Sequence, residues 1–192
     1  MKKEMTTKLL MNAAKKIIHS EGHQFVTVRH VAEEAGYTYP ILYHYFKDLD
    51  SLLWNLRLEM IEDMISELPK PSLKNIDPVS DLKRVLKTYA EYYFYHPNVF
   101  RFFYFYPFKK PENDDGYDKL EQRFQGMWQQ SFVRLVQEGY MKQEEIATVA
   151  KTIIYTIQGM ILLSLSANGS LTEKEVYKEL DLIIDYIIRK EA

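Results

Sequence analysis

Residues 27–52 read TVRHVAEEAGYTYPILYHYFKDLDSL, and the first part of this stretch predicts a short helix followed by a sharp turn. Thr27 is a good N-cap for a helix over about 28–35, because its hydroxyl can accept a hydrogen bond from an early backbone N–H. Gly36 comes directly after this helix. Glycine takes the positive φ that a sharp turn needs without steric cost, so the chain is expected to reverse here.

The second part of the stretch predicts another short helix, over about 39–45. Thr38 is expected to cap it, and Pro40 in its first turn costs no needed hydrogen bond. Two short helices joined by a turn of three or four residues that contains glycine form a helix-turn-helix. The second helix of that motif is suited to the major groove of DNA.

The side chains of the motif fit this use. The start of the second helix is expected to expose Thr38 and Tyr39, and its far end carries the donors Tyr43, His44 and Lys47. Hydroxyl and ammonium donors suit phosphates. In the helix before it, Arg29 is placed to reach either a phosphate or a guanine edge.

A plainer interpretation of the same spacing stays open. The stretch is also compatible with a tight corner between two helices whose aromatic residues, Tyr43, Tyr45 and Phe46, only fill a core. Spacing alone does not separate the two alternatives.

The rest of the chain also carries helical patterns, because its apolar residues recur at spacings of three and four and no alternating pattern of two is found. The fold class is therefore all-α, with about nine helices. Outside the motif the expected helices cover about 6–21, 49–67, 78–95, 98–107, 117–138, 144–167 and 172–190.

Composition excludes several classes of protein. The chain has 25 Lys plus Arg and 27 Asp plus Glu, so it lacks the excess positive charge of proteins that coat nucleic acid. A local basic face is still allowed. Cysteine is absent, which removes disulfides, thiolate zinc sites and a cysteine nucleophile. No phosphate-binding glycine loop or catalytic grouping is found, so neither an enzyme nor a cofactor or metal is expected. His19 and His23 are interpreted as solvated side chains rather than metal ligands.

Localisation is expected to be cytoplasmic. The N-terminus has no signal-peptide pattern, because Glu4 interrupts its start and Lys15 and Lys16 break any apolar run. The most apolar stretch, 153–165, is expected to be too short and too polar to span a bilayer, which needs about 20 apolar residues.

The motif resembles the TetR family of bacterial one-component transcriptional regulators. The resemblance rests on Ala35-Gly36 followed by Thr38 and then by the string Leu-Tyr-His-Tyr-Phe-Lys at 42–47, and it is detailed over 8–56. Two departures are Tyr37, where a small aliphatic residue is usual, and Leu49, where a phosphate-binding lysine is common.

The resemblance implies a set of roles. Tyr45 and Phe46 are implied to pack inside. The residues implied to approach DNA are Thr27, Arg29, Thr38, Tyr39, Tyr43, His44 and Lys47. It further implies a DNA-binding domain over 1–48 and a helical ligand-binding and dimerisation domain over 49–192. Such a protein would be a repressor that binds a palindromic operator as a homodimer and is released by a small lipophilic effector. The alternative is a helical protein that binds small molecules or lipids without DNA function.

Aromatic residues are concentrated in residues 89–108, which hold six Tyr and six Phe. They cover more positions than one buried stripe of a helix, so core, subunit interface and ligand cavity all stay open as explanations. The candidate effector-binding residues are Tyr92, Phe103, Phe124, Trp128, Phe132, Tyr155 and Gln158. Few charges lie nearby in the sequence, so the effector is expected to be neutral or singly cationic.

The last two long helices are apolar nearly all round. Ile153, Ile157 and Ile161 mark one face of the first, while Ile184 and Ile187 belong to the apolar set of the second. A helix that is apolar all round is covered on two sides. One side is expected to face the chain's own core and the other a second copy, in a four-helix interface. The resemblance implies the same dimer.

Overall fold

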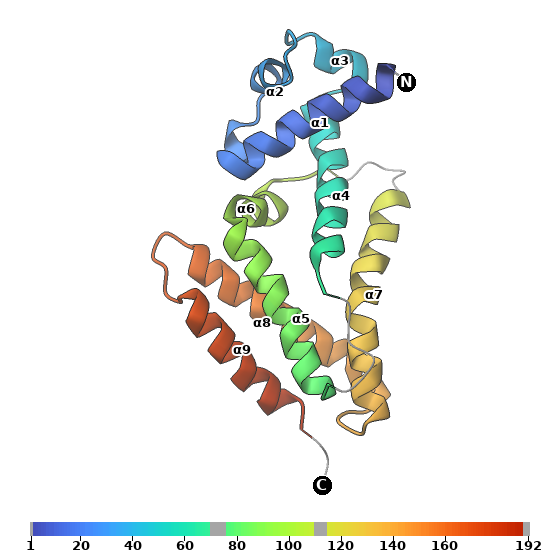
Figure 1. Cartoon of the computed structure of the whole chain (residues 1–192), viewed down its shortest axis with the longest axis vertical. Helices are drawn as coiled ribbons and strands as arrows, with labels where there is room; N and C mark the ends of the chain where they lie inside the picture. Colours follow the sequence, from blue (N-terminus) through green and yellow to red (C-terminus); the bar gives the residue numbers. More distant parts are fainter. Residues whose placement is uncertain (1, 70–75, 110–114, 190–192) are drawn as a thin grey trace. The chain divides into compact units, whose positions relative to one another are not determined.

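The computed structural model describes residues 2–69, 76–109 and 115–189, which form helices and connections without any strand. In chain order the elements are α1 (Lys2–Ser20), η1 (His23–Phe25), α2 (Val28–Glu34), α3 (Ile41–Tyr45), α4 (Leu49–Glu67), α5 (Pro78–Tyr95), α6 (Pro97–Phe105), α7 (Asp115–Gln137), η2 (Gln143–Glu145), α8 (Ile146–Leu165) and α9 (Glu173–Ile187) (Figure 1). The predicted all-α fold is confirmed. The helix predicted over 49–67 has those bounds, whereas α1 begins before the predicted residue 6.

The chain folds as two compact units, each made of two chain segments. Unit 1 contains Met1–Met64 and His96–Leu120, and unit 2 contains Ile65–Tyr95 and Glu121–Ala192. The helix-turn-helix therefore shares a unit with most of α4 and with α6. The domain boundary expected after residue 48 stays a prediction.

Unit 1 is built around α1, which packs against α2, α3 and α6. The core positions of these helices are fully buried: Leu10, Ala14, Ile18, Val31, Ala32 and Leu42. The side-chain amide of Asn98, on α6, donates a hydrogen bond to the backbone carbonyl of His19 at 3.1 Å. The last turn of α1 is thereby tied to the start of α6, because that carbonyl lies at a helix end where partners inside the helix run out.

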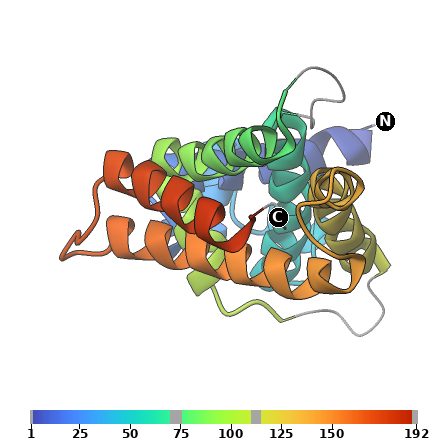
Figure 2. The same cartoon turned by 90° about the horizontal axis from the view of Figure 1, so that it is seen from below.

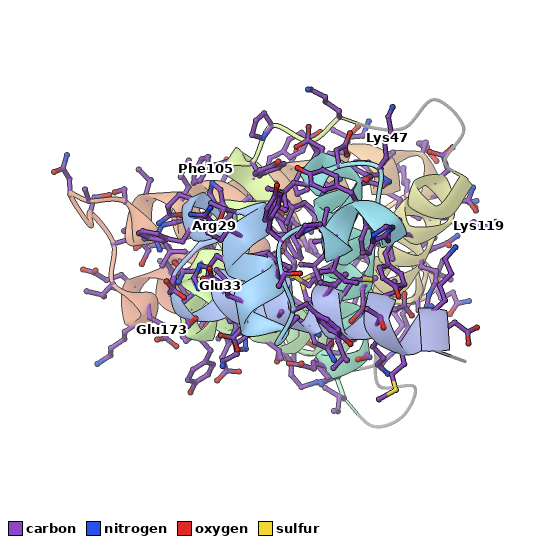
Figure 3. All side chains as sticks on the ribbon, turned by 90° about the horizontal axis from the view of Figure 1, so that it is seen from above. Arg29, Glu33, Lys47, Phe105, Lys119 and Glu173 are labelled. Carbon is purple, nitrogen blue, oxygen red and sulfur yellow. The ribbon has the colours of Figure 1, made fainter. Side chains whose placement is uncertain are left out.

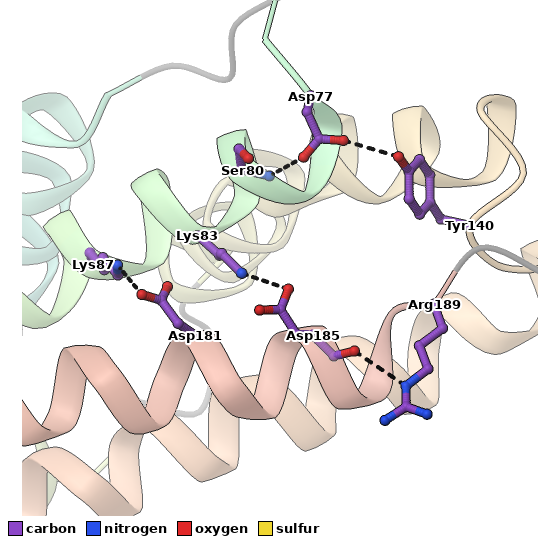
Figure 4. Close-up of polar contacts among 8 residues, drawn as sticks. All are labelled: Asp77, Ser80, Lys83, Lys87, Tyr140, Asp181, Asp185 and Arg189. Carbon is purple, nitrogen blue, oxygen red and sulfur yellow. Dashed lines mark hydrogen bonds and ion pairs between the residues drawn. The ribbon is translucent and has the colours of Figure 1, made fainter.

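Unit 2 is built around α5, α8 and α9, which pack against one another. Apolar side chains such as Leu82, Leu86 and Leu180 are fully buried between them. Two ion pairs join α5 to α9 at the edge of this core: Lys83 to Asp185 and Lys87 to Asp181, each at 2.6 Å (Figure 4). Ion pairs at a surface contribute little each, so apolar burial sets the packing of these helices.

The apolar character of α8 corrects one expectation. The helical stretch Gln143–Leu165 contains a window of 18 residues with a mean hydropathy of 1.6 and is long and apolar enough, by length and composition alone, to cross a membrane. The apolar stretch expected over 153–165 has the wrong bounds, because residues before 153 continue the apolar helix. Only 22% of the most apolar window is buried within the chain, so much apolar surface of this helix has no cover in one copy.

Candidate nucleic-acid interface

The turn between α2 and α3 is held by backbone hydrogen bonds. Gly36 has φ of 77°, in the left-handed region that glycine adopts readily. The N–H of Tyr37 then donates to the carbonyl of Ala32 at 2.8 Å, which satisfies a carbonyl in the last turn of α2. This geometry turns the chain sharply and confirms the predicted role of the glycine.

The two helix starts differ in how well the sequence predicts them. The N-cap of α2 is confirmed, because the backbone N–H of His30 donates to the Thr27 hydroxyl at 3.1 Å. The cap predicted for Thr38 is wrong: α3 begins at Ile41, with Pro40 at its N-cap. Thr38 uses its backbone carbonyl instead, which accepts from the N–H of Ile41 at 3.1 Å, so a turn leads into the helix.

The inward side of α3 anchors it to unit 1. Leu42 is fully buried and Phe46 nearly so, whereas Tyr45 is half-buried. The predicted inward packing is therefore found for Phe46 and only in part for Tyr45. Because Tyr43 is exposed, the plainer interpretation of an aromatic core fails at that residue.

The side chains predicted to approach DNA share one property, which is exposure to solvent: Thr27, Arg29, Thr38, Tyr39, Tyr43, His44 and Lys47. Figure 3 shows this end of unit 1, with Arg29 and Glu33 on α2 and Lys47 after α3. The fold leaves these groups available to a partner, and their contact with DNA stays a prediction.

The ring of His30 joins neighbouring elements of unit 1 behind the exposed face. Its ring is half-buried, and Nδ1 lies 3.1 Å from the carbonyl of Phe25. Its Nε2 lies 3.6 Å from the carboxylate of Glu21. The imidazole therefore ties α2 to η1 and to the end of α1, a role that its spacing in the sequence does not reveal.

The start of α4 fixes the position of the chain just after Lys47. The N–H of Ser51 donates to the Asp48 carboxylate at 2.8 Å, and the N–H of Asp48 donates to the Ser51 hydroxyl at 3.1 Å. These bonds to Ser51 hold the pKa of the Asp48 carboxyl below its usual value. The reciprocal pair acts as a helix cap, so α4 begins rigidly beside the exposed face.

The candidate effector-binding residues are divided between the two units. Tyr92, Trp128 and Phe132 are buried in unit 2, where Gln158 is half-buried. Phe103 is buried in unit 1, and the side chain of Phe124 lies outside the described part of the structure.

Tyr89, which is not among these candidates, stands at the centre of the unit 2 group. Its ring lies 5.6 Å from that of Trp128 and 5.1 Å from that of Tyr93. The amide of Gln158 donates to its hydroxyl at 3.4 Å. Tyr89 and Tyr93 are almost fully buried, so this region is closely packed in the structure.

Tyr155 does not join this group, because its side chain is 68% exposed. Ile153 and Ile157, two residues away on either side, are buried. A separation of two residues on a helix is about 200°, so Tyr155 projects from the opposite side of α8. Within one copy of the chain it cannot line a pocket with Tyr92 and Trp128.

Sequence reasoning missed a groove of about 550 Å³ between α5 and α9 in unit 2. Lys83, Arg84 and Lys87 lie along it on α5, and Tyr177 and Asp181 lie along it on α9. The carboxylates that pair with the two lysines come from residues about a hundred positions later in the chain. No local spacing in the sequence therefore indicates the groove.

Comparison with known proteins finds a family match for the segment that contains the helix-turn-helix. Residues 10–54 match the model of the bacterial regulatory proteins of the tetR family. Residues 10–54 therefore carry a helix-turn-helix segment of the TetR type. This match covers α2, α3 and the start of α4, the elements that carry the exposed face.

Solved structures of TetR-type regulators resemble nearly the whole chain. A regulator from Streptomyces coelicolor is 17% identical, with a TM-score of 0.70 over 96% of this chain and 80% of that one. RolR, solved with its ligand resorcinol, is 16% identical, with a TM-score of 0.71 over 100% and 91%. The fatty acid degradation regulator FadR from Bacillus halodurans is 14% identical, with a TM-score of 0.72 over 97% of each chain. At these identities the similarity establishes the fold, and no curated protein matches the sequence.

The comparisons identify the helix-turn-helix segment and the fold of the chain. Residues 10–54 are similar to the helix-turn-helix segment of bacterial regulatory proteins, and nearly the whole chain has the fold of solved TetR-type regulators.

Proposed function

We propose that this protein is a cytoplasmic repressor of the TetR type that binds a palindromic operator as a homodimer and is released by a small, mostly lipophilic effector. The observation that carries the DNA part is the exposed face of unit 1, where α3 presents hydrogen-bond donors on the side opposite its buried Leu42. A symmetric dimer would bring two such faces to successive major grooves.

Removing two donors from this face is expected to weaken operator binding without unfolding the chain. His44→Ala combined with Lys47→Ala removes exposed side chains that contribute little to the packing of the core. Each lost hydrogen bond to a charged phosphate is worth about 1.5–3 kcal/mol, so affinity should fall by at least tenfold. Mobility shift or fluorescence anisotropy with DNA upstream of the gene measures this, and the salt slope should also become shallower.

Lys174→Ala is the matched control, because Lys174 is an exposed lysine on α9, in unit 2 and outside the helix-turn-helix. It should leave operator affinity unchanged. Unaltered binding by the double variant, with its fold intact by circular dichroism, would remove these residues from the DNA interface.

The dimer part of the proposal is supported by apolar surface on α8 and α9, which lie side by side (Figure 2). Large apolar side chains on these two helices are exposed: Tyr155, Leu162, Leu163, Leu182 and Tyr186. Exposed apolar patches of this kind are typical of protein interfaces. A second copy placed against the same helices would cover them in a four-helix arrangement.

The effector part is supported by the group around Tyr89 and Trp128 in unit 2. Its aromatic rings supply apolar contact area, and the Tyr89 hydroxyl and Gln158 amide supply orienting polar groups. The hydroxyl of Ser131, which is 2% exposed on α7, has no hydrogen-bond partner among the described residues. A small ligand that carries a polar atom would satisfy it. RolR was solved with resorcinol, a small aromatic compound, and this precedent favours an effector of similar character.

Trp128 provides a test that does not depend on the identity of the effector. In a Trp54→Phe background it is the only tryptophan. Titration with small phenols and other lipophilic aromatic compounds is expected to change its fluorescence, because a ligand beside the indole alters its surroundings. Operator affinity should fall over the same concentration range, since coupling between two sites is reciprocal.

Ser131→Ala provides the accompanying control, because it removes the unpartnered hydroxyl and leaves the aromatic rings in place. The substitution should weaken the binding of compounds that carry a hydroxyl and leave the binding of compounds without one unchanged. If a broad panel changes neither fluorescence nor operator affinity, the aromatic group is core and the effector site lies elsewhere.

A further inference from the structure

The surface around α3 contains an unusual concentration of exposed aromatic rings. Tyr37, Tyr39 and Tyr43, here called the tyrosine patch, are all exposed within seven residues. Tyr39 and Tyr43 are the most open, at 55% and 56%. Large exposed ring surface is costly in water and commonly marks a place where a partner covers it. On this face the proposed partner is the floor of the major groove.

The residues that usually read purines are missing from the same segment. Bidentate recognition of guanine uses Arg or Lys, and bidentate recognition of adenine uses Asn or Gln. The segment 36–47 contains none of Arg, Asn and Gln, and its one lysine, Lys47, lies beyond the end of α3. Readout from α3 must therefore come from single hydrogen bonds and from contact with the tyrosine rings.

Thymine offers the group that fits such a surface. It is the natural base that presents a methyl group in the major groove, and apolar side chains recognise it by contact with that methyl. A tyrosine ring laid against the methyl would bury apolar area on both partners. The adjacent O4 atom can accept one hydrogen bond from a hydroxyl, which Thr38 and the phenols themselves supply.

We propose that Tyr39 and Tyr43 read the 5-methyl groups of thymines in each half-site, so that the operator carries thymines at the positions opposite α3. This inference rests on the proposed DNA binding and specifies its chemistry. It differs from the alternative in which the phenol hydroxyls only bond phosphates, because phosphate contacts carry no sequence information.

Replacing thymine by deoxyuridine tests this directly, because the exchange removes the methyl group and leaves base pairing unchanged. Duplexes that bind the full-length chain are first selected from a random pool, and each thymine is then replaced singly. Loss of one methyl contact should weaken binding about fourfold at the sensitive positions, from the transfer free energy of one such group. Replacement outside the half-sites serves as the DNA control.

Protein variants then assign each methyl to a ring. Tyr39→Ala or Tyr43→Ala should abolish the uridine effect at its own position, because the ring that senses the methyl is gone. Tyr39→Phe and Tyr43→Phe are the matched controls: they keep the ring and should keep the uridine effect. Both tyrosines are exposed, so these variants should melt like the parent chain.

The possible results separate the inference from the proposed function. Selected duplexes that bind equally well with thymine or uridine, while the Phe variants bind more weakly, would overturn methyl recognition and leave DNA binding intact. Failure to enrich or bind any duplex would overturn the proposed function, and the inference with it.

Discussion

Leu182→Arg combined with Tyr186→Arg is expected to convert the protein to a monomer and to reduce operator affinity by more than about a hundredfold. Both side chains are exposed on α9, so the charges meet no core within one copy. In the proposed dimer each arginine would be buried without a partner, at a cost of about 3 kcal/mol or more. Each separated head would then read only half a site. Analytical ultracentrifugation and a mobility shift assay measure the two effects.

Tyr95→Arg is the matched control for this experiment. Tyr95 ends α5 and is 73% exposed, close to the 72% of Tyr186, so the same change occurs on a different helix. It should leave both the oligomeric state and operator affinity unaltered. A parent chain that sediments as a monomer at micromolar concentration would itself contradict the proposed dimer.

The helix-turn-helix can be predicted in detail because its signals are local. A hydroxyl at Thr27 and a glycine at 36 each act within a few residues, and the structure shows the expected cap and the expected positive φ. The wrongly predicted cap at Thr38 shows the limit of prediction from local signals. Whether a residue uses its side chain or its carbonyl depends on where the helix starts, and Pro40 moves that start to Ile41.

Features that depend on packing between distant segments are less predictable. In α8 the apolar residues cover nearly all sides of the helix, so the sequence does not indicate which side faces the chain's own core. The structure buries Ile153 and Ile157 and leaves Tyr155 exposed. A helix that is apolar all round gives no periodicity from which to choose its inner face. The expectation of a helix that is apolar nearly all round is wrong for α9, because seven of its 15 residues are charged and the buried Val176, Leu180 and Ile184 mark its inner face at intervals of four.

The aromatic run over 89–108 has one feature that the sequence predicts and one that it does not. It is expected to serve several surfaces, and its residues do fall in two units. Tyr89 packs in unit 2 beside Trp128, whereas Phe102 packs in unit 1. The change occurs at His96, where α5 ends and Pro97 begins α6. The proline predicts this break, but the partners of each ring come from remote helices.

Phe102 is the centre of an aromatic cluster that joins three parts of unit 1. Its ring lies 5.0 Å from that of Phe108 and 6.4 Å from that of His23. Phe108 in turn contacts the ring of Trp54 on α4, at 6.0 Å. Next to it, the hydroxyl of Tyr106 donates to the carboxylate of Asp50 at 2.5 Å, and burial together with this bond raises the pKa of the phenol. The cluster therefore fastens the segment after α6 to the first turns of α4.

Phe102→Ala is expected to destabilise unit 1 by about 3–5 kcal/mol, the usual cost of deleting a fully buried phenylalanine. The loss should be this large because the ring touches η1, α6 and the following segment, so no single neighbour can move to fill the space. Urea unfolding followed by Trp54 fluorescence, in a Trp128→Phe background, reports on unit 1 because Trp54 lies within it. Phe105→Ala is the control, since this residue of the same helix is 53% exposed and its loss should cost less than about 1 kcal/mol. Equal destabilisation by the two variants would show that the aromatic cluster does not hold α6 in place within unit 1.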